Sequence, residues 1–224
     1  MRAEKRESAA ERAYRELRLA IVDGQLPSDR KVTEHGLADQ FQISRTPIRE
    51  AVKRLILEGL LERREGHGLW CAVPDDAQIV EIFDLRLRLE SYAARCAAER
   101  ASVEQIEELT RSAKAMAELC REAPATDSLI SEIDEENARF HGLVIQATHS
   151  QRLIHLLKAT VDISLVSRTF RQFTPDQRSR SAAHHLEIAA AITARAPLWA
   201  ERMMEVHILS AAESFKMSLE PSRA

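Results

Sequence analysis

Residues 44–64, SRTPIREAVKRLILEGLLERR, decide the fold of the N-terminal third of this 224-residue chain. Ser44 can cap a helix that runs to about Glu58, and Gly59 ends it. Apolar residues recur along this helix at the spacing of one buried face, which comprises Ile48, Ala51, Val52, Leu55 and Ile56. The segment therefore predicts a helix with one buried side, followed directly by a strand.

Two shorter helices are expected before this segment, and the second strand of a hairpin after it. Residues 10–22 carry apolar side chains at helical spacing, and Thr33 can cap a second helix over residues 33–41. Residues 60–63 and 69–73 are expected to be strands, joined by the turn at 65–68 with its two glycines. Three helices and a glycine-containing hairpin, in this order, predict a winged helix-turn-helix.

The helix after Ser44 would then enter the major groove of operator DNA. Arg45 and Arg49 are four residues apart and share the face opposite the apolar one, and an arginine can bond both O6 and N7 of guanine. These two arginines are therefore the expected base readers. The alternative is a solvated helix face, in which the basic side chains pair with Glu50 and Glu58.

Several neighbouring residues have the chemistry to hold phosphates. Ser44 and Thr46 lie at the helix N-terminus, where hydroxyls and backbone N–H groups favour an anion. Lys53 continues the basic face by one turn and is expected to contact a phosphate. In the hairpin turn, Gly66 and His67 permit a close approach to the minor groove or its phosphates.

The run from about residue 14 to residue 73 resembles the DNA-binding domain of the GntR regulators. The resemblance rests on "AIVDGQL" and "LADQFQISRTPIREAVKRLILEGLLERREGHG", in that order. It implies that Arg45, Thr46 and Arg49 contact DNA, with a wing at residues 66–67. It also indicates His35, which stands where some members carry a DNA-contacting arginine, although a histidine there can equally be a surface residue.

The composition agrees with a mainly helical, cytoplasmic protein that does not enter a membrane. Residues 1–73 carry 14 Lys and Arg against 12 Asp and Glu, so the excess of acidic residues lies in the remainder. That asymmetry fits a first part that binds phosphates. Three widely spaced cysteines favour a reducing cytosol over a disulfide framework, and no apolar stretch has the length of a membrane span or signal peptide.

Everything after Pro74 is expected to be helical, and the spacing predicts helices at about residues 76–100, 102–120, 128–148, 151–172, 178–195 and 197–218. The fold class is therefore mainly α. We expect a winged helix-turn-helix domain at residues 10–73, a linker at 74–77, and an all-α helical bundle at 78–218 that binds a ligand.

Six of the eight histidines lie in this helical half, and three of them sit in amphipathic helices: His141, His185 and His207. Imidazole is a common ligand for zinc and nickel, and a bundle can direct several histidines to one centre. A single histidine is more often a hydrogen-bonded core or surface residue. The residues alone therefore favour the ordinary role for each of the three.

The helical half resembles the FCD ligand-binding domain of FadR-type GntR regulators over about residues 77–215. The matching stretches are "IFDLRLRLESYAARCAAERA", "ENARFHGLVIQAT", "HHLEIAAAITAR" and "MMEVHI". Many members hold a divalent metal, and by motif its ligands here are His141, His185 and His207. Asn137 occupies the position of the family's aspartate, so a neutral carbonyl would replace a carboxylate and weaken the site. Asp134, two turns before His141, is a candidate to compensate.

The same resemblance implies a pocket for a small effector, often a carboxylate, with the metal at its base. Arg86 matches a family arginine that can face this pocket, and the alternative for it is a surface salt bridge with Glu90. The expected function is a homodimeric, ligand-responsive repressor of a metabolic operon. The rivals are an architectural DNA-binding protein, and a metal-dependent hydrolase, for which neither a His-Glu-x-x-His run nor a nucleophile elbow is found.

Overall fold

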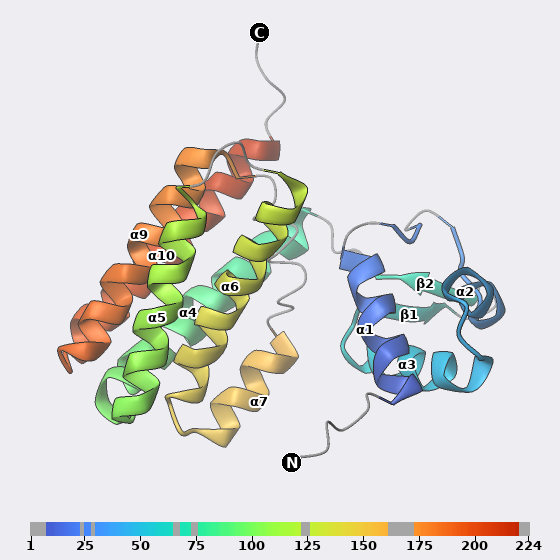
Figure 1. Ribbon diagram of the computed structural model, residues 1–224, viewed down its shortest axis with the longest axis horizontal. Coiled ribbons are helices and arrows are strands. Elements are labelled where there is room, and N and C mark those ends of the chain that lie inside the picture. The colour runs from blue at the N-terminus through green and yellow to red at the C-terminus, as the bar shows by residue number, and fades with distance from the viewer. Residues whose placement is uncertain are drawn as a thin grey trace, which may run out of the picture. The chain divides into compact units, whose positions relative to one another are not determined.

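The computed structural model describes residues 8–22, 25–27, 30–64, 68–72, 76–121, 126–160 and 173–219 (Figure 1). The chain divides into two compact units, Met1–Asp75 and Asp76–Ala224. The first unit contains α1 (Ala9–Val22), α2 (Glu34–Phe41), α3 (Arg45–Leu57), β1 (Leu61–Arg64) and β2 (Gly68–Cys71). Three helices followed by a hairpin confirm the winged helix-turn-helix expected from the sequence.

Capping and burial explain where the helices of this unit begin. The backbone N–H of Gly36 donates to Thr33 Oγ1 over 3.0 Å, so Thr33 caps α2 as predicted. Ser44 is the N-cap residue of α3, but its hydroxyl makes no capping hydrogen bond. The three helices and the hairpin share one core, whose fully buried members include Leu17, Ile48, Val52, Leu55 and Leu61.

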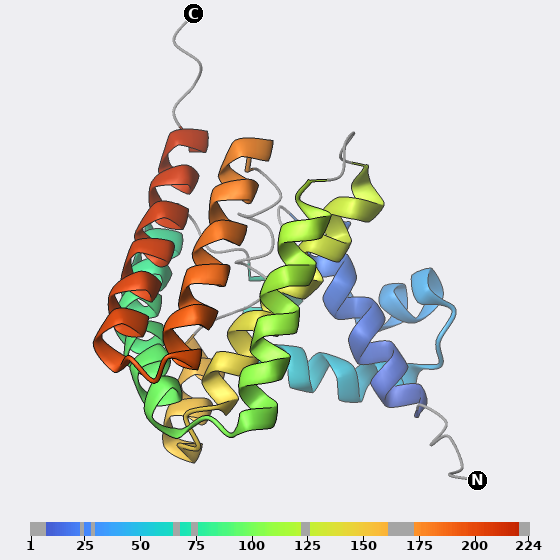
Figure 2. The ribbon, with the colours of Figure 1, turned by 60° about the vertical axis from the view of Figure 1, so that its left-hand side comes forward.

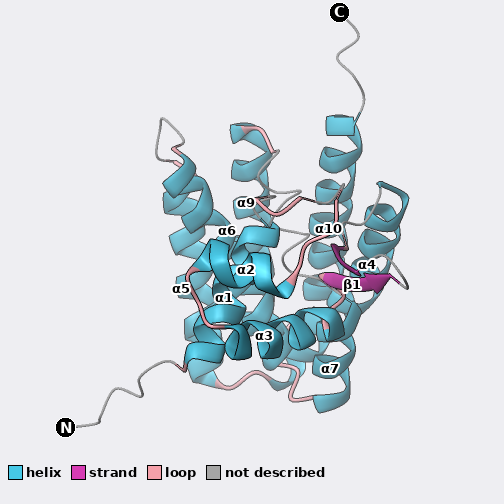
Figure 3. Cartoon of the chain, turned by 90° about the vertical axis from the view of Figure 1, so that its right-hand side faces the viewer, coloured by secondary structure: helices cyan, strands magenta, loops and turns pink. Residues whose placement is uncertain are grey.

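The hairpin is antiparallel, with Leu61 opposite Cys71 and Arg64 opposite Gly68. It is visible in Figure 3, where β1 is drawn in magenta beside α2 and α3. The first strand lies one residue later than predicted, and Val32 adds a β-bridge, its N–H donating to the carbonyl of Leu69 over 2.8 Å. Gly68 has φ of 90°, a backbone conformation that glycine adopts without strain.

The second unit is a helical bundle, as predicted. Its described residues form α4 (Asp76–Arg100), α5 (Val103–Leu119), α6 (Asp127–Gln146), α7 (Gln151–Thr160), α9 (Pro175–Thr193) and α10 (Pro197–Leu219). Helix α10 packs against α4 and α9, and α5 packs against α6 and α9 (Figure 2). Their shared core includes Phe83, Phe140, Ile188, Ile192 and Met204.

Two helices of this unit have bounds that differ from those expected from the sequence. The helix expected at residues 178–195 begins at Pro175, because Thr174 and Gln177 form a capping box and proline suits the first helical position. The helix expected at residues 151–172 is seen as α7 to Thr160, and residues 161–172 lie outside the described residues. Within the described part of the chain, no helix is long and apolar enough to cross a membrane.

Candidate functional site

Helix α3 presents one basic face to solvent and buries the opposite one. Arg45, Arg49 and Lys53 are exposed, while Ile48 and Val52 are completely buried. This division follows from the helical period, because residues four apart lie on one side of the helix. Ser44 and Thr46 are also exposed, at the N-terminus of α3. The structure therefore places five of the predicted DNA-contacting residues on one exposed surface.

Some of the basic side chains on α3 take part in ion pairs within the unit. Lys53 Nζ lies 2.8 Å from Glu50 Oε1, and Arg54 Nε lies 3.2 Å from Glu58 Oε1. The Arg54 guanidinium also covers the ring of Tyr14 at 3.5 Å from its centroid. Arg54 therefore joins α1 to α3. Its ion pair with Glu58 is one that the alternative of a solvated helix face anticipated.

A carboxylate on α2 connects the basic face of α3 to the hairpin. Glu34 accepts a hydrogen bond from Arg49 Nε over 3.4 Å and another from Arg63 of β1, through one terminal nitrogen, over 2.7 Å. The bond from Arg63 is the main cause that holds the pKa of Glu34 below its usual value, and Arg49 contributes to the same shift. Neither Glu34 nor Arg63 could be expected at this site from the sequence, because no spacing reveals contacts among three separate elements.

The remaining predicted DNA contacts are His35 on α2 and the turn residues Gly66 and His67. His35 on α2 is 70% exposed, and its Nε2 lies 3.5 Å from Asp39 Oδ2 one turn later. That position is compatible with the ordinary surface role as well as with DNA. Gly66 and His67, the expected tip of the wing, lie outside the described residues.

In the second unit, three helices direct histidines to one buried point. His141 of α6, His185 of α9 and His207 of α10 are 6%, 0% and 3% exposed, and one candidate ligand nitrogen of each lies within 4.8 Å of the others. The Nε2 atoms of His141 and His207 are 3.1 Å apart. Two ligands about 2.1 Å from one zinc ion at tetrahedral angles are about 3.4 Å apart, so this spacing suits a shared ion.

The position of His141 is fixed by a buried carboxylate that the sequence did not reveal as a partner. Glu90 Oε2 lies 2.5 Å from His141 Nδ1, and Glu90 Oε1 accepts a hydrogen bond from Arg86 Nε over 2.6 Å. With Nδ1 held by Glu90, His141 turns Nε2 toward the other histidines. A carboxylate behind a ligating histidine is the usual means of fixing its tautomer and orientation.

Burial and mutual repulsion keep two of the histidines neutral. Burial is the main cause that lowers the pKa of His185 and of His207 well below its usual value, and the neighbouring histidines lower it further. Among the described residues, neither ring nitrogen of His185 has a hydrogen-bond partner, and Nδ1 of His207 has none. Neutral, unpartnered imidazole nitrogens in the interior are costly unless something binds them, and a divalent metal ion needs neutral imidazole ligands.

Asn137, Asp134 and His184 are the other candidate ligands on the helices that carry the three histidines. Asn137 and Asp134 are both 4% exposed on α6, and Asn137 precedes His141 by one turn. In the described residues, the group of possible metal ligands consists of the three histidines, without Asp134. His184 is only partly buried, and its ring centre lies 5.9 Å from that of His207. The fit to a metal thus rests on His141, His185 and His207.

Arg86 forms the ion pair with Glu90 that was the alternative to a position facing the effector pocket, but this pair does not lie at the surface. Both side chains are 3% exposed, so the expectation of a surface salt bridge was wrong about its location. The reason is that Arg86 and Glu90 occupy the inner face of α4, where His141 supplies a second partner for the carboxylate. Burial tends to raise the pKa of Glu90, but Arg86 and His141 outweigh it and hold that pKa well below its usual value.

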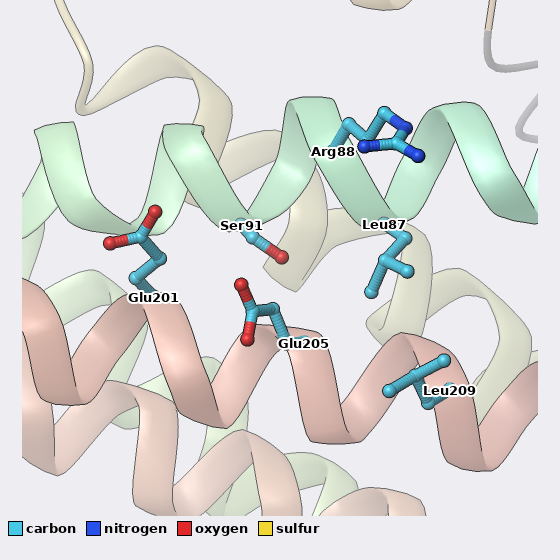
Figure 4. Close-up of a pocket in the computed structure, with 6 residues that line it drawn as sticks. All are labelled: Leu87, Arg88, Ser91, Glu201, Glu205 and Leu209. Carbon is cyan, nitrogen blue, oxygen red and sulfur yellow. The ribbon is translucent and has the colours of Figure 1, made fainter.

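A separate pocket of about 380 Å³ lies between α4 and α10 (Figure 4). Leu87, Arg88 and Ser91 line it from α4, and Glu201, Glu205 and Leu209 line it from α10. The same two helices also carry exposed apolar side chains outside the pocket lining, namely Leu85, Tyr92 and Leu198. None of the residues predicted to bind metal or effector lines this pocket.

Comparison with known proteins assigns a family to each unit. Residues 9–70 match the bacterial regulatory proteins of the gntR family, and residues 81–210 match the FCD domain. The chain is 31% identical to the Nta operon transcriptional regulator of Aminobacter aminovorans over 165 residues, which cover 74% of each chain. It is 31% identical to the gluconate operon transcriptional repressor of Bacillus subtilis, over 62% of this chain and 55% of the relative.

The fold has a counterpart among solved structures. The structure of E. coli McbR/YncC matches 95% of this chain and 99% of its own, with a TM-score of 0.76 and 16% sequence identity. At that identity the likeness concerns the fold alone.

Proposed function

The chain belongs to the gntR family of bacterial regulatory proteins and carries an FCD domain, and we propose that it represses a metabolic operon in response to a small organic acid. Relatives named as repressors of the gluconate operon and of a D-xylose utilization operon support this assignment. The protein then acts on gene expression in the cytoplasm, and not as an enzyme.

The observation that carries the proposal is the exposed basic face of α3. Arg45 and Arg49 read guanine edges in the major groove, while Ser44, Thr46 and Lys53 hold phosphates on either side of them. The buried face of the same helix anchors it in the core of the unit, so the arginines are presented by a rigid element. His35 and the wing residues Gly66 and His67 complete the contact surface.

The test is operator binding measured with purified full-length chain. DNA fragments selected by the protein from its own genome supply the operator, and a shuffled duplex of equal composition is the control. Arg45→Ala is expected to weaken operator binding by about tenfold or more and to leave the shuffled duplex nearly unaffected. Binding that is independent of sequence, and unchanged in Arg45→Ala, contradicts base readout by α3.

The buried histidines are the proposed site of a divalent metal ion, zinc or nickel. His141, His185 and His207 supply imidazole nitrogens, and Asn137 supplies a neutral carbonyl oxygen in place of a carboxylate. Glu90 orients His141 through Nδ1, and Arg86 holds Glu90 in place. When bound, the ion would supply a Lewis-acid position for the carboxylate of an effector, and Arg86 is the arginine that we propose to face the same effector.

Metal binding can be tested apart from DNA. The chain is treated with a chelator, dialysed and titrated calorimetrically with zinc or nickel. One ion per chain is expected for wild type and for His155→Ala, since His155 is exposed on α7. His207→Ala is expected to lose that binding. Equal binding by wild type and His207→Ala excludes this site.

Regulation requires that effector and DNA influence each other's affinity. An acid that binds beside the metal would alter the packing of α4, α6, α9 and α10 and so bias the DNA-binding units. The influence must be reciprocal, so operator DNA must change the affinity for the acid by the same factor. Gluconate is a suitable first probe, because relatives are named for its operon.

We further propose that the chain is a homodimer and that the face of α4 and α10 around the pocket in Figure 4 is its interface. This face combines apolar side chains with Arg88, Glu201 and Glu205, so two copies related by a twofold axis can satisfy one another. Light scattering is expected to show a dimer that Leu209→Arg dissociates. Val103→Arg, which changes an exposed apolar residue on α5, should leave the dimer intact.

A further inference from the structure

We propose that Glu34 is a positioning residue for DNA recognition, because its carboxylate holds both Arg49 and Arg63, and that Arg63 is an additional phosphate contact. The inference rests on the DNA-binding function proposed above. It adds one acidic and one basic residue to the recognition surface, and it gives them different roles. Glu34 sets the direction of the base-reading side chain, while Arg63 adds affinity for any DNA.

The geometry places the carboxylate behind the two guanidinium groups. The Glu34 side chain is 22% exposed, whereas those of Arg49 and Arg63 are 56% and 60% exposed. Glu34 is the first residue of α2, and the Thr33 cap fixes the backbone there. A carboxylate on a fixed backbone therefore holds two arginines that remain open to solvent on their outer side.

The atoms used in the two contacts leave the right donors for DNA. Arg49 reaches Glu34 through Nε, 3.4 Å from Oε2. A bidentate contact with guanine needs two N–H donors, and the terminal nitrogens of Arg49 can provide them while Nε stays on Glu34. Arg63 reaches Glu34 through one terminal nitrogen at 2.7 Å and has further donors for a phosphate oxygen.

Because Glu34 already restricts the two arginine side chains, they lose less conformational entropy when DNA binds. A long arginine side chain in solution occupies many rotamers, and a contact that already restricts it leaves less freedom to be lost on binding. The carboxylate also offsets part of the positive charge of the two arginines. Glu34 is therefore expected to raise the preference for operator while reducing the affinity for unspecific DNA.

Two isosteric variants separate these effects. Glu34→Gln and Glu50→Gln each remove one negative charge from this surface, and both should raise the affinity for a shuffled duplex slightly. Glu50 contacts Lys53 rather than a base-reading arginine, which makes it the matched control. Glu34→Asp keeps the charge but shortens the side chain by one methylene, so that it cannot reach both arginines.

The readout is the ratio of dissociation constants for shuffled and operator duplexes, measured by fluorescence anisotropy with the full chain at several salt concentrations. We expect this ratio to fall at least about fivefold in Glu34→Gln and in Glu34→Asp, and to stay within about twofold in Glu50→Gln. Arg63→Ala should weaken binding to both duplexes by the same factor. It should also reduce the slope of log affinity against log salt concentration by about one.

A double-mutant cycle connects Glu34 to Arg49. If Glu34 acts through Arg49, Glu34→Gln has no further effect on the ratio once Arg49 is alanine. Thermal unfolding of each variant shows whether it is folded. A fold defect would weaken binding to both duplexes together and leave the ratio of their dissociation constants unchanged.

The outcomes are distinct. If wild type prefers operator but Glu34→Gln and Glu34→Asp show the same ratio as Glu50→Gln, the positioning role of Glu34 is overturned. An Arg63→Ala chain with unchanged affinities overturns the phosphate contact. A wild-type chain without any preference for operator overturns the proposed function, and this inference falls with it.

Discussion

Replacement of Glu90 by glutamine probes the buried chain from Arg86 through Glu90 to His141. Glutamine has nearly the same shape, so no cavity forms, but the carboxylate charge between Arg86 and His141 is lost. Both members of the ion pair are 3% exposed, so the Arg86 guanidinium remains in the interior without a charged partner. Removal of one member of a buried pair costs about 3–5 kcal/mol, and the amide oxygen of glutamine brings the expected value to about 3 kcal/mol.

This loss should be visible in thermal unfolding of the helical unit. Each kcal/mol lowers the midpoint of a unit of this size by about 2–4 °C, so Glu90→Gln should unfold about 6–12 °C below wild type. Trp70 belongs to the first unit and Trp199 to the second, so fluorescence in a Trp70→Phe background reports on the helical unit alone.

Glu99→Gln is the matched control, because Glu99 lies on the same helix but pairs with Arg95 at a side-chain exposure of 42%. It should change the midpoint by less than about 2 °C, as exposed ion pairs contribute little. In addition, zinc affinity should fall about 10- to 100-fold in Glu90→Gln, because His141 loses the carboxylate that orients it. Midpoints of the two variants within 1–2 °C of each other would refute the reasoning.

Three further predictions concern both units. Leu55→Ala, at a completely buried position of α3, should lower the free energy of unfolding of the first unit by about 2–5 kcal/mol in urea titrations, and a loss below 1 kcal/mol contradicts the assigned core. Tyr14→Phe removes the hydroxyl that donates to Glu58 at 2.8 Å and should cost about 1 kcal/mol in the same titration; no loss means that the bond contributes nothing. Asn137→Asp should tighten zinc binding on the order of tenfold in calorimetry, because it supplies a charged oxygen, and unchanged affinity places Asn137 outside the ligands.

The fold could be predicted from local patterns because those patterns act over a few residues. The Thr33 cap of α2, the apolar period of α3 and the two glycines of the turn predicted at residues 65–68 are each local signals. In one place the prediction missed a signal that is itself local. The start of α9 at Pro175 follows from Thr174 and Gln177, a capping box that the sequence displays openly.

The candidate sites could be predicted only in part. Arg45 and Arg49 share a helix, so helical spacing places them on one face. The approach of His141, His185 and His207 depends on the packing of three helices, and it was expected only through the family resemblance. Glu90 lies 51 residues from His141, and no pattern in the sequence relates the two.

The contacts of Glu34 show the same limit in the first unit. Glu34 lies 15 residues from Arg49 and 29 from Arg63, and the three meet only because α2, α3 and β1 pack around one core. A charged residue at the start of a helix is commonplace, and its usual explanation is a favourable interaction with the helix dipole. Its function becomes visible only when the partners are placed around it.

The central claim is that α3 reads operator DNA, and the most direct test is the affinity of wild type, Arg45→Ala and Arg49→Ala for operator and shuffled duplexes in the same salt. The account predicts that each substitution weakens operator binding by about tenfold or more and changes shuffled-duplex binding by much less. If wild type binds both duplexes equally, or if both variants bind operator as tightly as wild type, the account is contradicted.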